Sequence, residues 1–290
     1  TAISLNQAIE LSLQHNNGFK ASQNQLTMAT QLRKTAVDIG KTDVYYSFDQ
    51  NNIAPNNKAL NVFGISQTVR FPTFYAAQKS VLQTKEQLAG FTVQQHEIRL
   101  RKEVTNAYQA ILFWRSMVSN YEYLDSIYRN FSKAATRKLE AGATNTLEAL
   151  TAQTKQKEIS ILLAQSKSNV ERAELQFNKW IQSDSLYTAT PDELTPMLIN
   201  ELDTVSNPSL QYLRLSQRFA EQSLKLNKQA ALPDLKFGVF QGTNNGTGTN
   251  RYMGVQAGLA IPLFYGADKA RVAVARTDVT VRENEYNDYQ

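Results

Sequence analysis

Hydrophobic and polar residues alternate along several short stretches of this chain. In the last of these stretches, one set of alternate positions holds the apolar residues Met253, Val255, Leu259 and Ile261. The positions between them hold small or polar residues such as Gly254 and Gln256. A period of two is typical of a β-strand whose two faces meet different surroundings, so residues 251–261 are predicted to form a strand.

Three further stretches follow the same rule and complete two hairpins. Tyr46 and Phe48 alternate with polar residues, and after an asparagine-rich turn the chain returns through Phe63 and Ile65. A strand over 236–241 precedes the one at 251–261, with a glycine-rich run between them. The pattern therefore predicts one β-hairpin over 44–71 and a second over 235–261.

The stretch from Val62 to Lys79 is repeated from Tyr252 to Lys269. The matching positions include Gly64 with Gly254, Pro72 with Pro262, Phe74 with Phe264 and Tyr75 with Tyr265. In both copies a strand pattern leads to a proline, which cannot donate to a strand ladder but suits the first turn of a helix. Taken alone, the unit would also fit a strand–loop–helix segment of an ordinary soluble α+β domain.

Two very long helices are predicted between the hairpins. No proline occurs from Thr73 to Thr190, and Gly142 is the one glycine near the middle. A seven-residue series contains Val93, Leu100, Ala107, Trp114, Tyr121, Tyr128 and Ala135. A second series contains Val104, Ile111, Val118 and Leu139, interrupted by Asp125 and Ser132.

Heptads sustained over this length indicate coiled-coil packing. The return helix offers Leu147, Leu150, Ile161, Ala164, Val170, Ala173, Phe177 and Trp180 as its apolar contacts. The sequence therefore predicts a long antiparallel helical hairpin over 74–180. The first helix, to about Ala141, would reach roughly 100 Å at 1.5 Å per residue.

The remaining segments complete two structural repeats. A short helix over 3–15 with Ser4 as N-cap and a helix over 19–40 open the first repeat, residues 1–181. Residues 182–206 contain two prolines and several acids and are interpreted as a connector. Residues 207–290 form the second repeat, with a helix, a hairpin and the start of a long helix. We expect this repeat to be truncated relative to the first.

Composition removes several classes of chemistry. The chain has no cysteine, and its two histidines, His15 and His96, lie far apart without a neighbouring ligand, so no catalytic, cofactor or metal site is predicted. The net charge of +5 is spread out, and a basic stretch at 99–102 is interpreted as a solvated helix face, so no nucleic-acid binding is expected. No stretch approaches the roughly 20 apolar residues of a membrane-spanning helix.

The turn between the long helices allows two interpretations. Gly142 could serve as the C′ residue of an αα-turn, with Thr144 or Asn145 capping the next helix. Alternatively, a projecting turn is a place for a partner to dock.

Four motifs together resemble the TolC family of outer-membrane efflux channels. They are the opening helix Ile3–Asn17, the helix-to-strand entry with Asn207-Pro208 and Leu232-Pro-Asp-Leu, the strand-to-helix exit Ile261-Pro-Leu-Phe-Tyr-Gly, and the tip Gly142–Leu150. The opening and the overall pattern are similar to heavy-metal efflux members. The resemblance implies a mainly α fold, in which long antiparallel coiled-coil hairpins and two β-hairpins contribute to a trimeric transmembrane β-barrel of twelve strands.

The resemblance also implies roles for particular residues. The alternating face with Met253, Val255, Leu259 and Ile261 would meet lipid. An aromatic belt at the membrane interface would consist of Phe71, Phe74, Tyr75, Phe264 and Tyr265. The tip residues Gly142, Ala143, Thr144, Thr146 and Leu147 would dock a periplasmic adaptor. Glu148 falls where relatives often have an aspartate involved in gating.

The resemblance implies an outer-membrane channel of a tripartite efflux system in a Gram-negative-type bacterium. Such a homotrimer would be a passive export duct for small molecules or metal cations, with a periplasmic extension and no cofactor. Adaptor and inner-membrane pump would be its partners and outer-membrane lipid its surroundings. The alternative is a soluble coiled-coil periplasmic adaptor or scaffold. An enzyme with a helical domain is disfavoured because the sequence offers no catalytic site.

Overall fold

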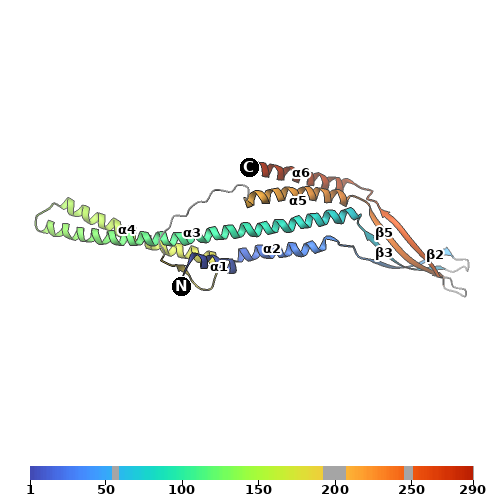
Figure 1. Cartoon of the computed structure of the whole chain (residues 1–290), viewed down its shortest axis with the longest axis horizontal. Helices are drawn as coiled ribbons and strands as arrows, with labels where there is room; N and C mark the ends of the chain where they lie inside the picture. Colours follow the sequence, from blue (N-terminus) through green and yellow to red (C-terminus); the bar gives the residue numbers. More distant parts are fainter. Residues whose placement is uncertain (54–58, 192–206, 245–250, 290) are drawn as a thin grey trace. The chain divides into compact units, whose positions relative to one another are not determined.

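The computed structural model describes residues 1–53, 59–191, 207–244 and 251–289 (Figure 1). Long helices and one antiparallel sheet account for most of these residues. The chain divides into two compact units, and some helices contribute to both. One unit contains Thr1–Asn24 and Val93–Asp203, and the other contains Gln25–Thr92 and Thr204–Gln290.

In the first unit, helix α1 (Leu5–His15) begins at the predicted cap. The Ser4 hydroxyl accepts a hydrogen bond from the Gln7 amide, and the Gln7 side chain accepts one from the Ser4 amide, so both satisfy free donors at the helix start. Ile3, which was predicted inside this helix, instead lies in a short strand, β1 (Ala2–Ile3). It pairs in parallel with β4 (Thr188–Ala189), a strand within the predicted connector that no sequence pattern indicated.

Polar contacts hold the first part of the connector, residues 187–189, against the helical hairpin. Arg115 donates to the Ala189 carbonyl at 2.7 Å and to Glu174 Oε1 at 2.9 Å. Asn178 bonds both the amide and the carbonyl of Tyr187 at 2.8 Å, as a neighbouring strand would. These contacts explain why residues 187–189 are ordered although their sequence looks irregular. Most of the rest of the predicted connector, 192–206, lies outside the described residues.

The predicted helical hairpin is confirmed. Helix α3 (Pro72–Glu140) has 69 residues, and α4 (Thr146–Ile181) runs back along it (Figure 1). All members of both heptad series on α3 are buried or half-buried. In the first unit Leu100, Val104 and Ile111 join Phe177 and Ile181 in the main hydrophobic core, so the seven-residue period does define the inward face.

The prediction for the first half of α4 is wrong. Leu147, Leu150 and Ile161 are exposed, as is Ala164, while Ala149 and Ala152 are buried. Small side chains at the contact let two helices approach closely. The large apolar residues of this part of α4 are therefore left exposed beside the contact with α3 and remain available to another surface.

Asp125 interrupts the apolar seam of α3 with a buried polar layer. Its side chain accepts a hydrogen bond from Ser160 Oγ at 2.9 Å and from Gln156 Nε2 at 3.4 Å, and it pairs with Arg129 one turn later. The hydrogen bond from Ser160 lowers the pKa of the Asp125 carboxyl, with help from Gln156 and Arg129, although burial opposes the shift. The carboxylate thus has partners on both helices.

Helix α2 (Asn17–Arg33) continues into a 3-10 turn, η1 (Lys34–Ala36), and ends earlier than the predicted Gly40. The Thr35 hydroxyl donates to the Leu32 carbonyl at 2.7 Å, which satisfies one of the free acceptors at the helix end. Within the second unit, the last turn of α2 is held to α3 by an ion pair between Arg33 and Glu86 at 3.0 Å.

The sheet in the second unit has four strands in the order β2-β3-β5-β6, all antiparallel to their neighbours. The strands are β2 (Asp43–Ile53), β3 (Ala59–Val69), β5 (Asp234–Asn244) and β6 (Arg251–Ala260). Both hairpins are confirmed, with first strands longer than predicted. The middle of each predicted turn, 54–58 and 245–250, lies outside the described residues.

Helices α5 (Pro208–Ala230) and α6 (Gly266–Tyr289) run antiparallel (Figure 1), and Arg214 Nε donates to the Tyr286 hydroxyl at 2.9 Å. Helix α6 begins four residues after Pro262, whereas α3 begins at Pro72 itself. The Thr73 hydroxyl bonds Gln229 and anchors the first turn of α3, and Leu263 at the matching position cannot make this contact.

Candidate functional site

The turn between α3 and α4, which we call the tip, is built around Gly142. Gly142 has a φ of 71°, in the left-handed region that favours glycine. Its amide donates to the Leu139 carbonyl at 3.0 Å, and the Ala143 amide donates to the Lys138 carbonyl at 2.8 Å. This is the Schellman pattern, so the prediction of Gly142 as the C′ residue is confirmed.

Asn145 is the N-cap of α4, which decides between the two predicted caps. Its side-chain oxygen accepts a hydrogen bond from the Glu148 amide at 2.9 Å. The Glu148 carboxylate in turn accepts a hydrogen bond from the Thr144 hydroxyl. A carboxylate in the first turn is also favoured by the helix dipole. Glu148, the predicted gating residue, therefore helps to fix the start of α4.

A groove of about 460 Å³ lies beside the tip. Both helices contribute to its lining, which consists of Phe131, Ala134, Ala135, Lys138, Thr144, Leu147, Glu148, Thr151 and Ala152. The side chain of Leu147 is 72% exposed, and Phe131 is also exposed. Of the predicted tip residues, Gly142, Ala143 and Thr146 are exposed and Thr144 is half-buried. The groove thus combines apolar side chains with one cationic and one anionic side chain, those of Lys138 and Glu148.

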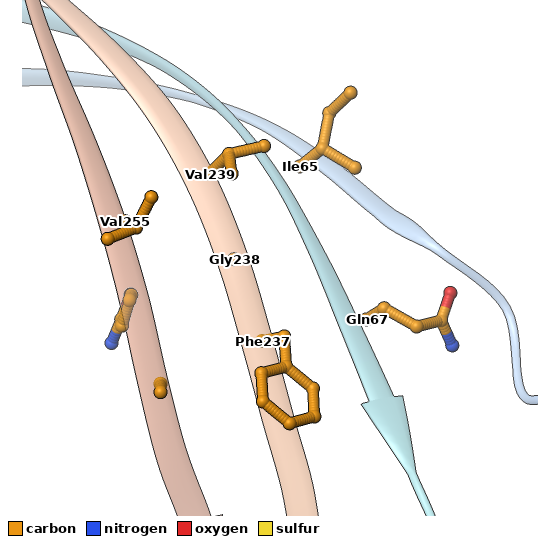
Figure 2. A pocket seen from close by; sticks show the side chains of 8 residues that line it. Ile65, Gln67, Phe237, Gly238, Val239 and Val255 are labelled. Carbon is orange, nitrogen blue, oxygen red and sulfur yellow. The ribbon is translucent and has the colours of Figure 1, made fainter.

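One face of the sheet is apolar across all four strands. The residues Val44, Ile65, Val239 and Val255 pair in register and form a continuous transverse row. Figure 2 shows Ile65, Val239 and Val255 on three neighbouring strands, with Phe237 farther along β5. Val255 is 85% exposed, and the other three are exposed as well. We call this surface the apolar face.

The predicted lipid-facing residues belong to this surface or adjoin it. Met253, Val255 and Leu259 lie on the apolar face of β6, and Ile261 follows the end of the strand; all four are exposed. The predicted lipid-facing residues are confined to β6 and its end, but the face extends farther. It also carries the exposed residues Val44, Tyr46, Phe48, Phe63, Ile65, Phe237 and Val239. Alternation in the other three strands was the signal that could have identified them.

The opposite face of the sheet is built mainly of small and polar residues. In β6 it carries Gly254, Gln256 and Gly258, and in β2 it carries Asp43 and Asp49. We call this surface the polar face. A sheet that exposes bulky apolar side chains on one side and polar ones on the other can separate two different environments.

The two predicted aromatic clusters differ in their surroundings. Phe74 and Tyr75 are half-buried at the start of α3 and pack edge to face, with ring centroids 5.7 Å apart. The Tyr75 hydroxyl accepts a hydrogen bond from the Arg70 amide at 3.1 Å, while Phe71 is exposed. Phe264 is 90% exposed, and Tyr265 is exposed too, because α6 starts only after them.

The described part of the chain contains no group of three or more His, Asp or Glu side chains arranged to hold a metal ion. Within the same part, no helix combines the length and the hydropathy needed to cross a membrane.

The chain resembles solved structures but matches no known sequence family. No protein-family model matches the sequence, and no curated protein matches it significantly. The outer membrane channel CmeC of Campylobacter jejuni aligns with 98% of this chain at 13% identity and a TM-score of 0.77, over 67% of its own length. CusC, whose structures concern folding and transmembrane channel formation, aligns with 99% at 12% identity and a TM-score of 0.78, over 73% of its length.

The outer membrane protein VceC of Vibrio cholerae aligns with 98% of this chain at 13% identity, with a TM-score of 0.73, over 75% of its own length. At such identities the likeness concerns the fold. It includes both the helical hairpin and the four-stranded sheet, because nearly the whole chain is aligned in each case. The chain therefore has the fold of the TolC family of outer-membrane channels, the family that its repeated motifs resemble.

Proposed function

We propose that the protein is a passive export duct in the outer membrane of a Gram-negative-type bacterium, with its helices extending into the periplasm. The observation that carries this proposal is the exposed apolar face across four strands, in a chain with an outer-membrane channel fold. The apolar face would meet lipid, and the polar face would line a water-filled lumen. Transport needs no cofactor and no catalytic residue, because solutes diffuse through the lumen.

The working form in this proposal is a homotrimer. Four strands cannot close a barrel, and β2 and β6 would leave open edges in lipid, where unpaired backbone groups are costly. Three chains would give twelve strands and remove all edges. The exposed apolar residues Leu150, Ile161 and Leu175 on α4 offer contact surface for neighbouring chains.

The two structural repeats, 1–181 and 207–290 with the connector between them, would each supply one hairpin to the barrel. Two resemblances in local structure favour this division. The side chains of Asn16 and Asn207 each cap the following helix, accepting from the amides of Phe19 and Ser209. Equivalent aspartates, Asp43 and Asp234, open the first strand of each hairpin.

The tip is the proposed docking site for a periplasmic adaptor, which would link the duct to an inner-membrane pump in a tripartite efflux system. The groove with Phe131 and Leu147 offers an apolar anchor surface of the kind that partner helices occupy. Glu148 is the proposed gating residue, since its contact with Thr144 could be exchanged for one with a partner. Small organic molecules and metal cations are the proposed cargo classes.

The aromatic residues at the junction of sheet and helices would form the belt at the membrane interface. Phe71, Phe74 and Tyr75 follow β3, and Phe264 and Tyr265 follow β6, at the matching place in each repeat. Aromatic side chains are enriched at this level of membrane proteins because they are partly apolar and partly polar.

The test is the assembly and conductance of the full-length protein. Light scattering after size-exclusion chromatography, with and without detergent, should reveal a trimer that requires detergent. Planar lipid bilayers should show discrete channel steps after its addition. A monodisperse monomer or dimer without detergent, and no conductance, would favour the soluble coiled-coil adaptor or scaffold instead.

A further inference from the structure

A transverse row of alternating aromatic residues and glycines crosses the polar face of the sheet. Tyr45 pairs with Gly64, Gly64 with Phe240, and Phe240 with Gly254, so the four residues occupy one row on β2, β3, β5 and β6. They are directed to the same side of the sheet, because paired residues in antiparallel strands share a face. This is the side that carries Gln256 and Gly258.

Each ring of this row lies over the neighbouring glycine. A Cβ added to Gly64 would come closer than 3.0 Å to the far end of the Tyr45 ring, and one added to Gly254 would meet the far end of the Phe240 ring in the same way. The far end of a ring can reach the adjacent strand only if the ring lies along the sheet. Gly64 is accordingly buried, and both rings are half-buried.

Other glycines of the same face do not have this relation to an aromatic ring. A Cβ at Gly238 would make ordinary contacts of 3.4 Å or more, and one at Gly258 would meet nothing within 4 Å. The positions beneath the two rings, Gly64 and Gly254, therefore require a residue without a side chain, and Gly258 does not. Gly254 and Gly258 nevertheless lie on the same strand and the same face.

We propose that Gly64 and Gly254 hold the Tyr45 and Phe240 rings flat against the inner wall, and that these rings set the free cross-section of the duct at this level. The proposal rests on the proposed function, in which the polar face lines the lumen. A trimer would carry six such rings. A side chain at either glycine would lift the ring from the wall and direct it into the path of the solute.

The decisive comparison is Gly254→Ala against Gly258→Ala in the full-length protein. Single-channel recording in planar bilayers should show a loss of unitary conductance on the order of tens of per cent for Gly254→Ala, because conductance follows the width of the pore. Gly258→Ala should conduct as the parent does. Adding Phe240→Ala to Gly254→Ala should restore the conductance, since the displaced ring is then removed.

Equal conductance of Gly254→Ala and Gly258→Ala would overturn the proposal, as would failure of the double variant to recover. A parent protein that forms no channel at all would instead overturn the proposed function, and this inference with it.

If Gly254→Ala does not assemble, cysteine substitution provides the second measurement, since the parent contains no cysteine. A charged, water-soluble thiol reagent should reduce the current through Phe240→Cys and leave Val239→Cys unchanged, because Val239 belongs to the apolar face. Reduction at both positions, or at Val239→Cys alone, would contradict the proposed placement of the ring.

Discussion

Gly142 is the residue at which the long helical hairpin reverses direction. Its positive φ places it where an L side chain clashes with the backbone, and its amide and that of Ala143 cap the end of α3. The turn therefore depends on one residue type at one position. Gly90, the other glycine of the hairpin, lies inside α3 and has open space around it.

These two glycines should respond in opposite ways to the same substitution. We expect Gly142→Ala to lower the free energy of unfolding by roughly 1–2 kcal/mol, the cost of a left-handed conformation for an L residue. Gly90→Ala should raise it by about 0.5–1 kcal/mol, because alanine loses less entropy in a helix. Unfolding followed by far-UV circular dichroism measures both. The same sign for both variants would contradict the assignment of the turn.

Asp125 is the other residue whose individual chemistry matters for the hairpin. Its partners are Ser160 and Gln156 on α4 and the charged Arg129 on its own helix. Because its pKa is lowered in the folded protein from the ordinary 3.8, the carboxylate stabilises the fold above that value. This contribution disappears as the pH falls through the folded pKa.

We therefore expect Asp125→Asn to lower the thermal midpoint of the helices at neutral pH. The difference from the parent should begin to shrink as the pH falls below about 4 and should vanish below the lowered folded pKa, where the parent carboxyl is protonated too. Thermal unfolding at a series of pH values measures this. Glu122→Gln is the matched control, since its pair with Lys167 is exposed and worth little. A difference independent of pH would rule out the charged form as the stabilising one.

At the scale of elements, the helical hairpin buries a narrow seam and exposes other apolar residues. The heptads of α3 face inward, but the first half of α4 contributes alanines to the contact and exposes its leucines. At the tip this arrangement leaves Leu147 exposed in the lining of the groove. One face of the helical hairpin therefore buries the apolar seam that stabilises it. A second apolar surface is exposed near the tip.

Leu147→Glu should weaken adaptor docking with little effect on folding. A charge in an apolar groove must lose its hydration when the partner covers it, which is costly. We expect an increase of the adaptor dissociation constant of about tenfold or more, corresponding to roughly 1.4 kcal/mol. Surface plasmon resonance with immobilised trimer measures it. Gln165→Glu, at an exposed site farther along α4, is the control, and equal effects of both would speak against docking at the tip.

At the scale of the whole molecule, the two faces of the sheet differ in polarity, and the proposed channel places them in different surroundings. Neighbouring residues of β6 lie on opposite faces, so Val255 belongs to the apolar face and Gln256 to the polar one. A substitution by the same residue at these two positions therefore compares the proposed lipid and lumen sides while the strand, the depth and the added charge remain nearly constant.

Val255→Arg should impair insertion or stability of the trimer by up to about 2–4 kcal/mol, the cost of arginine on the lipid face near the bilayer centre. Gln256→Arg should assemble as the parent does, because the proposed water-filled lumen would hydrate the charge. Heat-modifiability of the membrane-extracted trimer on gels measures both. Unimpaired assembly of Val255→Arg would mean that the apolar face does not contact lipid.

The sequence by itself determined the long helices, the tip and both hairpins. Periods of seven and two are local properties of the chain, and a glycine or proline interrupts them wherever the backbone must turn. The repeat added the correspondence between the hairpins, so the resemblance to an outer-membrane channel family could be stated from a few motifs. Gly142 as C′ residue and Ser4 as N-cap were correct for the same local reason.

Only the tertiary structure decided which apolar residues meet inside the molecule. The exposure of Leu147 and Leu150 depends on the rotation of α4 against α3, which small residues permit and the sequence period alone does not fix. The strand at 188–189 forms because side chains far away in sequence, such as Arg115, hold it in place. The row of rings over glycines depends on the register of three strand pairs, and register is a property of paired strands rather than of any one strand.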